Sequence, residues 1–164
     1  MRPFDEINRL ERAEWLDRPA AAARSVVQRV LRHKGIKDAL RKDRPAFLLE
    51  FLHNFYNWDV LGGKLVSERV VEDNWNVAAG ASAIGAVACV DAWIEDFRSD
   101  LSRNDVPTLI LHGDADRILP PDATSRRQAK LLRKGTFLEL AGGPHGVLWT
   151  HAEEVNRALV EFLA

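Results

Sequence analysis

Apolar residues recur at helical spacing through the first two thirds of the chain. Residues 1–34 are rich in arginine and alanine, and their apolar positions predict a helical arm whose relation to the rest is open. The clearest stripe follows Pro45, which suits a first helical turn, and consists of Phe47, Leu48, Phe51, Leu52 and Phe55. The pair Gly62–Gly63 ends that unit. The pattern predicts a helical region over residues 35–103.

Small residues dominate the stretch from Ala78 to Ala88. We expect Gly80 and Ser82 to divide it into two helices, because a glycine readily ends a helix and a serine hydroxyl can accept the unpaired N–H groups of the next one. Small side chains either let helices approach closely or line a pocket. Both interpretations stay open.

The pattern changes at Asp105–Val106–Pro107. Residues 108–111 form a nearly continuous apolar run, which is typical of a parallel strand covered on both faces. The next apolar positions predict a helix that starts at a cap provided by Asp122 or Thr124 and extends to Lys134.

A second strand is predicted over residues 136–140, followed by a glycine-rich loop. Thr150 and Glu153 then have the spacing of a capping box, which predicts the start of the last helix. The positions of that helix expected to face inward are Val155, Leu159, Phe162 and Leu163. Strand, helix, strand and helix predict a right-handed βαβα unit over residues 104–164. The expected fold class is therefore α/β, with a helical region before the last two parallel strands.

Charge and composition exclude several classes of protein. The 164 residues include 29% charged side chains and have a formal net charge of −1. Nucleic-acid and membrane-surface binders need a basic surface, so neither partner is expected. The single cysteine, Cys89, excludes an internal disulfide and suits a reducing compartment. No apolar run approaches the ~20 residues that span a bilayer, and the N-terminus resembles no signal peptide, so a cytoplasmic location is expected.

Two residues of catalytic type follow the two predicted strands. Asp116 lies in the loop after the first strand and His145 in the loop after the second. Parallel strands bring such loops to one edge of the sheet, so the carboxylate can accept a hydrogen bond from the imidazole and stabilise its protonated form. Alternatively, Asp116 caps a turn or pairs with Arg117, and His145 is an ordinary loop histidine.

The strings VPTLILHGDADRILP and GGPHGVLWTHAEEVNRALVEFL resemble the C-terminal part of the α/β-hydrolase fold. Within that fold they are most similar to the cofactor-free haloperoxidases, also described as arylesterases or perhydrolases. Upstream, KDRPAFLLEFLHNFYN and WNVAAGASAIGAVACVDAW resemble that family's helical cap. The resemblance covers roughly residues 35 to 164 and implies a catalytic aspartate at Asp116, with Asp114 as a nearby non-catalytic residue. It also implies a catalytic histidine at His145.

The sequence departs from this family at the nucleophile. Such an enzyme needs a serine in a G-x-S-x-G turn between a strand and a helix, placed before the aspartate and the histidine. The closest string, Gly80-Ala81-Ser82-Ala83-Ile84, has isoleucine in place of the second glycine and no strand before it. Ser82 is therefore expected to cap a helix or line a pocket. An upstream loop for an oxyanion hole is also missing.

Other candidate signals are weak. The remaining histidines have no spacing that would gather a metal, and we expect His112, at the end of a strand, to be a hydrogen-bonded structural residue. No phosphate-binding glycine loop is present. The sequence therefore implies no metal and no cofactor.

Two functional hypotheses follow. The resemblance implies a serine hydrolase of small esters or acyl compounds, with perhydrolysis that supports halide oxidation, of which this chain carries the aspartate and histidine without the nucleophile. The alternative is an inactive, truncated relative that acts by self-association or by binding a complementing chain, because two parallel strands leave a strand edge and an apolar face uncovered. A relative that uses an aspartate as nucleophile is a third reading of the missing serine.

Overall fold

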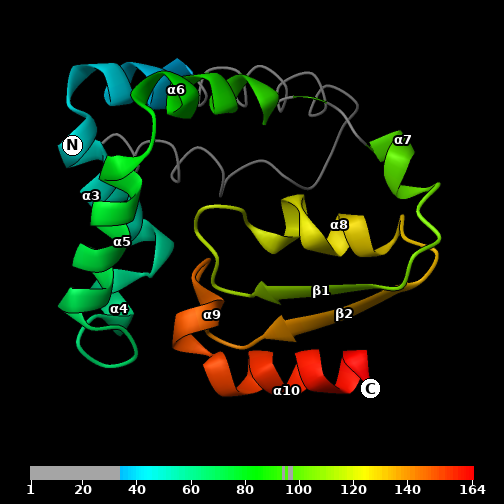
Figure 1. Ribbon diagram of the computed structural model, residues 1–164. Coiled ribbons are helices and arrows are strands. Elements are labelled where there is room, and N and C mark those ends of the chain that lie inside the picture. The colour runs from blue at the N-terminus through cyan, green and yellow to red at the C-terminus, as the bar shows by residue number, and fades with distance from the viewer. Residues whose placement is uncertain (1–33, 94, 96–97) are drawn as a thin grey trace, which may run out of the picture. The chain divides into compact units, whose positions relative to one another are not determined.

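The computed structural model describes residues 34–93, 95 and 98–164 (Figure 1). By internal contacts the chain divides into two compact units, one formed by Met1–Arg44 with Ala81–Glu95 and the other by Pro45–Gly80 with Asp96–Ala164. Nearly all of the arm predicted over residues 1–34 lies outside the described residues, and the division into regions 1–34, 35–103 and 104–164 stays a prediction.

The described part of the first unit consists of two helical segments, residues 34–42 and α6 (Ala83–Ala92). Ser82 begins α6 as a cap, because its Oγ accepts a hydrogen bond of 3.1 Å from the Gly85 N–H. An ion pair joins Lys37 to Asp91. The expected break in the small-residue stretch is confirmed, and so is the capping role of Ser82.

The second unit begins with three helices: α3 (Arg44–Phe55), α4 (Trp58–Leu61) and α5 (Glu68–Gly80). Asn57 separates α3 from α4 in a left-handed conformation with φ of 48°. The buried hydrophobic residues of these helices and their connections form one cluster, made of Leu52, Tyr56, Val66 and Val71. The apolar stripe of α3 thus contributes Leu52 to this core, with Phe55 partly buried against it.

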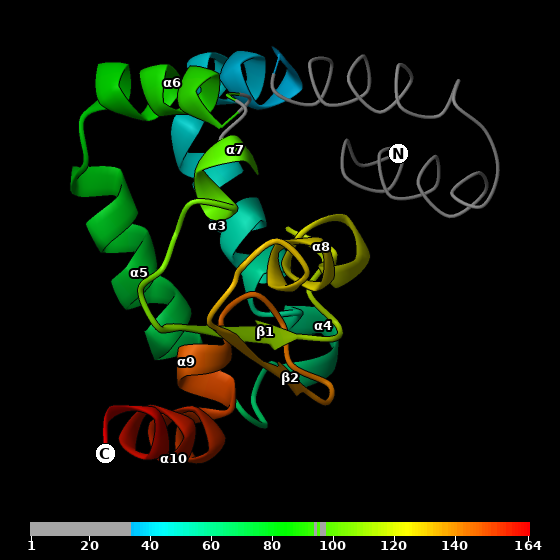
Figure 2. The same ribbon diagram turned by 90° about the vertical axis from the view of Figure 1, so that its right-hand side faces the viewer.

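The sheet of this unit has two parallel strands, β1 (Thr108–Gly113) and β2 (Gly135–Leu140), as predicted. In their register Thr108 faces Gly135 and Gly113 faces Leu140. A short helix, α7 (Arg98–Leu101), precedes β1. Between the strands lie a 3₁₀ turn, η1 (Pro121–Ala123), and α8 (Ser125–Ala129), and after β2 come α9 (Val147–Thr150) and α10 (Ala152–Leu163). Helices α8 and α10 lie on opposite faces of the sheet (Figures 1 and 2).

The helix between the strands is shorter than predicted. Instead of one helix that extends to Lys134, the chain forms η1 and then only the five residues of α8. Thr124 does not cap α8 with its side chain, because its Oγ1 donates to the Pro120 carbonyl oxygen at 2.9 Å. Asp122 does not cap it either, and pairs with Arg126 at 2.8 Å. Thr124 is thus the residue that precedes α8, one of the two predicted positions, but the predicted side-chain cap is absent.

The predicted capping box of the last helix is also wrong. Thr150 is the last residue of α9, and α10 begins at Ala152 without a side-chain cap. Val147, the first residue of α9, packs with Leu140 and Val155 in a buried cluster, so the chain is helical before it reaches Thr150. Thr150 is therefore already helical and buried, and its Oγ1 contacts the His151 ring at 2.8 Å instead.

The buried face of α10 differs from the predicted one. Val155 and Ala158 are buried and Phe162 is half-buried, at spacings of three and four residues. Leu159 and Leu163 lie on a neighbouring face and are 39% and 78% exposed. The expectation that these two leucines face inward is therefore wrong for the described part of the chain.

Among the described residues, no individual helix has the length and apolar character needed to cross a membrane. Helices α5 and α6 meet that criterion only when taken together, by length and composition, across the break between them.

Candidate active site

The two loops that follow β1 and β2 are fastened together. The Asp114 N–H donates to the Leu140 carbonyl oxygen at 3.0 Å, and the Ala115 N–H donates to that of Gly143 at 3.0 Å. The Asp114 carboxylate accepts the Gly142 N–H at 2.6 Å. Asp114 thus closes the junction between the loops.

Glycines permit this close approach. A Cβ atom on Gly113 would lie 2.0 Å from the Gly143 carbonyl oxygen, which no side chain can tolerate. Gly146 lies against α3, where its N–H donates to the Phe55 carbonyl oxygen at 3.0 Å, and a Cβ on it would lie 2.4 Å from the Tyr56 ring. The loop that carries His145 is therefore held between β1 and the end of α3.

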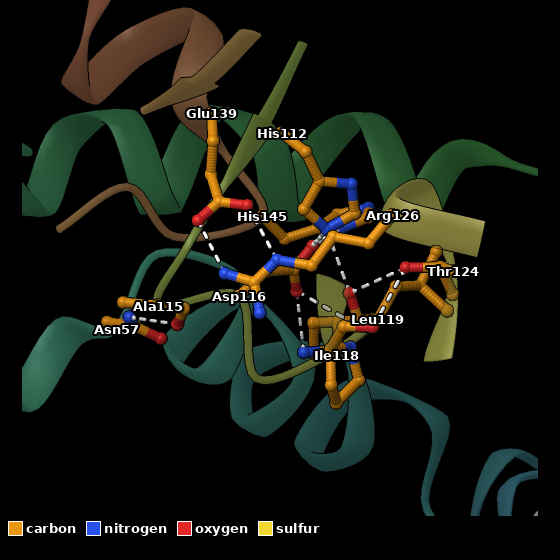
Figure 3. A network of polar contacts seen from close by, with 11 residues as sticks. Asn57, His112, Ala115, Asp116, Ile118, Leu119, Thr124, Arg126, Glu139 and His145 are labelled. Atoms are coloured by element: carbon orange, nitrogen blue, oxygen red, sulfur yellow. Dashed lines mark hydrogen bonds and ion pairs between the residues drawn. The ribbon is translucent and has the colours of Figure 1, made fainter. Parts of the chain in front are cut away.

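Asp116 and His145 meet at this place. The His145 Nδ1 lies 2.7 Å from the Asp116 Oδ2 (Figure 3). The Asp116 side chain is 2% exposed and that of His145 is 29% exposed. A carboxylate oxygen only accepts, so Nδ1 carries the proton and the neutral ring keeps its lone pair on Nε2. The Phe55 ring packs edge-on against the imidazole, with ring centres 4.8 Å apart.

The other oxygen of Asp116 holds a turn. Oδ1 accepts the backbone N–H groups of Ile118 at 2.8 Å and Leu119 at 2.9 Å. The turn-capping alternative for Asp116 is therefore present together with the histidine contact. Arg117 does not pair with Asp116, because it reaches Asp59 at 2.7 Å instead.

A second histidine contacts the same carboxylate. His112, the fifth residue of β1, places its Nε2 3.0 Å from the Asp116 Oδ2 and 2.8 Å from the Leu119 carbonyl oxygen. The expected hydrogen-bonded histidine is confirmed, whereas its contact with Asp116 was missed. The signal was its position at the end of the strand, four residues before Asp116. The hydrogen bond to Asp116 raises the pKa of His112 above 6.5, while burial opposes this shift.

The pKa of Asp116 lies well below its usual value of 3.8. Burial is the largest single influence and acts to raise this pKa. Hydrogen bonds from His112, His145 and the Leu119 N–H together outweigh it. Asp116 is therefore an ionised, buried carboxylate at neutral pH, as a residue that stabilises an imidazolium must be.

Asn57 also supports the site, although no motif in the sequence singled it out. Its side chain is buried, and its Nδ2 donates to the Ala115 carbonyl oxygen at 2.9 Å across 58 positions of the chain. Asparagine is one of the few residues that adopt the left-handed conformation readily, which was the available signal. Asn57 thereby joins the α3–α4 connection to the loop of Asp116.

An ion-pair network ties α8 to the sheet beside the site. Arg126 forms two hydrogen bonds to Glu139 in β2, one of them at 2.8 Å from its Nε. Glu139 faces His112 in the strand register (Figure 3). This network joins α8 to the β2 residue that lies opposite His112 in the register.

No nucleophile accompanies this pair in the described part of the chain. Among residues 34–93, 95 and 98–164, no serine hydroxyl is hydrogen-bonded to the His145 ring, and Ser82 belongs to the other compact unit. In the same residues, no cluster of three or more histidine, cysteine or acidic side chains could hold a metal ion.

Comparison with known proteins identifies the family of the chain. Residues 3–152 match the family described as the alpha/beta hydrolase fold. The chain is 50% identical over 129 residues to a provisionally named non-heme chloroperoxidase of Synechocystis sp., covering 79% of this chain and 47% of that protein. It is 36% identical over 113 residues to a bifunctional esterase/perhydrolase of Acinetobacter calcoaceticus, covering 66% and 40%.

Among solved structures, the bromoperoxidase from Bacillus anthracis is similar with a TM-score of 0.75 and 39% identity. That match covers 80% of this chain and 48% of the bromoperoxidase. The chain therefore spans about half the length of the relatives that it matches.

Proposed function

The chain belongs to the α/β-hydrolase fold family, and we propose that it supplies the acid–base half of a serine hydrolase active site. In this proposal His145 is the general base and Asp116 orients it. The substrates are small esters or acyl compounds, and the reactions are ester hydrolysis and perhydrolysis. Relatives named as non-heme chloroperoxidase and as esterase/perhydrolase support this choice.

One observation carries the proposal: the 2.7 Å contact between the His145 Nδ1 and the Asp116 Oδ2. It leaves Nε2 of His145 as the proton acceptor for a serine hydroxyl that attacks the ester carbonyl carbon. Nε2 then gives this proton to the leaving alcohol, and an acyl-serine remains. Water attacks the acyl-serine to release the acid, while hydrogen peroxide in its place releases a peracid that can oxidise a halide.

The described part of the chain does not present a nucleophile in the arrangement that this chemistry needs. It spans about half of its relatives' length, and Ser82 serves as a helix cap. We therefore propose that the nucleophilic serine and the oxyanion-binding N–H groups come from a polypeptide segment equivalent to the N-terminal part of those relatives. That segment would place the serine hydroxyl against Nε2 of His145.

A complementation assay tests this proposal. The chain is co-purified with the N-terminal part of the Synechocystis relative that it does not match, and hydrolysis of p-nitrophenyl acetate is measured. We expect no turnover from the chain alone and turnover from the pair. In the pair, His145→Ala abolishes turnover and Asp114→Asn, a matched change in the same loop, leaves it nearly unchanged.

Two results would contradict the proposal. Turnover by the chain alone that disappears in His145→Ala would place a nucleophile within this chain. A co-purified pair whose turnover is unaffected by His145→Ala would remove His145 from the reaction. Peroxide with acetate and bromide then tests perhydrolysis in the active pair, with brominated product as the readout.

A second candidate function is association without catalysis. In the described residues β1 pairs with β2 alone, so its other edge has no strand beside it. Helix α10 also exposes apolar side chains, namely Leu159, Val160 and Leu163. Exposed edges and apolar patches favour binding to another chain. Light scattering after size-exclusion chromatography tests this candidate, and a monomer that unfolds cooperatively would count against it.

A further inference from the structure

His112 has a fixed tautomer. Its Nε2 lies 2.8 Å from the Leu119 carbonyl oxygen and 3.0 Å from the Asp116 Oδ2, and both atoms can only accept. Nε2 must therefore carry a hydrogen, which it donates to the Leu119 carbonyl oxygen while lying within ion-pair distance of Oδ2. The His112 side chain is 12% exposed, so little water competes for this N–H.

Polar groups contact both oxygens of the Asp116 carboxylate. Oδ1 accepts two backbone N–H groups, from Ile118 and Leu119. Oδ2 lies 2.7 Å from the His145 Nδ1, which donates to it, and 3.0 Å from the His112 Nε2 as an ion-pair contact. Two oxygens offer about four acceptor positions in total. Each end of the carboxylate is therefore held, and its plane cannot turn without breaking a hydrogen bond.

The two histidines that contact Oδ2 lie in different kinds of backbone, one in a strand and the other in a loop. His112 belongs to β1 and faces Glu139 of β2 in the register, so its backbone is fixed by the sheet. His145 lies in the loop after β2. The carboxylate is therefore tied to the sheet through His112, and the His145 ring is oriented by a carboxylate that is already in place.

We propose that His112 is a positioning residue that aims the Asp116 Oδ2 at the His145 Nδ1. This inference rests on the proposed function of the Asp116–His145 pair. Without the His112 contact, His145 alone holds Oδ2, and we expect the hydrogen bond between the two to lengthen. The carboxylate then orients the imidazole less well, while the substrate-binding surfaces stay unchanged.

The test uses NMR of the full chain labelled with ¹⁵N. The observable is the Nδ1 proton of His145, which resonates far downfield when it is held by a carboxylate and protected from exchange. In His112→Gln the amide nitrogen replaces Nε2 as donor, so this resonance stays. In His112→Phe the donor is lost, and the resonance moves upfield or broadens beyond detection. His151→Phe is the matched control, because His151 contacts the Ala141 carbonyl oxygen and not Asp116.

An unchanged His145 resonance in a folded His112→Phe chain would overturn the proposal. If that variant does not fold, His112→Asn takes its place, because the shorter amide does not reach Oδ2. Equal His145 resonances in His112→Asn and His112→Gln would then overturn the proposal. Loss of the resonance in His112→Asn alone supports it. In the complemented pair, His112→Phe should lower kcat by on the order of 10²-fold at unchanged KM, with recovery in His112→Gln.

Failure of this proposal and failure of the proposed function are distinguishable. The NMR measurement needs neither a nucleophile nor a substrate, so it reports on His112 even when the complemented pair is inactive. Conversely, the complemented pair can be active while substitution of His112 leaves the His145 resonance unchanged. That result would support the proposed function and rule out the positioning role of His112.

Discussion

Replacing Asp116 by asparagine removes the charge of the site at almost constant volume. The asparagine oxygen can still accept the N–H groups of Ile118 and Leu119. Its NH₂ group then faces the two imidazole N–H groups, donor against donor. The His145 ring can accept a hydrogen bond from this NH₂ group only if its proton moves from Nδ1 to Nε2. That change removes the lone pair on Nε2 that a general base needs.

The size of the expected stability loss follows from the four contacts of the Asp116 carboxylate. Bonds to a charged acceptor contribute roughly 1.5–3 kcal/mol each, against about 1 kcal/mol for neutral ones. In Asp116→Asn the hydrogen bonds from the Ile118 and Leu119 N–H groups lose their charge assistance, and one of the two histidine contacts is lost. The neutral amide recovers part of the lost stability, because it avoids the desolvation of a buried charge. We expect Asp116→Asn to lower the free energy of unfolding by about 3 kcal/mol, a large share of the roughly 5–15 kcal/mol of a typical domain.

The stability difference between wild type and Asp116→Asn should become smaller at acid pH. The pKa of Asp116 is lower in the folded chain than its ordinary 3.8, so its stabilising contribution is complete above 3.8 and disappears as the pH falls through the folded value. Urea unfolding followed by tryptophan fluorescence, from neutral pH to about 3, measures this contribution as the difference between wild type and variant. That difference should be constant near neutrality and shrink at the acid end.

Asp114→Asn is the control, because Asp114 is exposed and accepts one backbone N–H. It should cost less than about 1 kcal/mol at every pH. An Asp116→Asn variant as stable as Asp114→Asn would refute the reasoning. So would a difference that grows toward acid pH, since Asp116 would then have its pKa raised by burial.

The remaining predictions concern His112 and the junction of the loops. Asp116→Asn removes the main cause of the raised pKa of His112, so an NMR titration should show this pKa move back toward 6.5; an unmoved value would assign the shift to another group. Gly113→Ala places a Cβ 2.0 Å from a backbone oxygen and should cost about 3 kcal/mol or more in urea unfolding. Gly80→Ala, where a Cβ meets no atom within 4 Å, should be neutral or stabilising, and equal losses in both would contradict the close approach.

The elements that the sequence predicted well depend on continuous local patterns. The apolar run of β1 and the placement of Asp116 and His145 after parallel strands were sufficient to predict that their side chains meet. This inference needs only the rule that parallel strands end at the same edge of a sheet. The break at Ser82 was predictable because a cap acts on the three residues next to it.

Predictions failed where packing decides between two local choices. Thr150 and Glu153 match a capping box, yet Val147 is buried against Leu140 and Val155 and makes the chain helical too early for Thr150 to cap. The contact of Asn57 with Ala115 was out of reach for a different reason. It joins residues 58 positions apart, and no periodic pattern encodes a single side-chain hydrogen bond of that range.

The four groups that contact the Asp116 carboxylate explain how the pair forms although the described residues present no nucleophile. All of them belong to residues 112–145, that is, to β1, β2 and the loops between and after them. A buried charge is tolerated when hydrogen bonds compensate its desolvation, and here β1 and the two loops at its end provide that compensation themselves. The ionised carboxylate and the correct histidine tautomer therefore exist before any other segment binds. Such a segment needs to deliver only a hydroxyl and oxyanion donors to Nε2 of His145, which is why complementation is the decisive experiment for this chain.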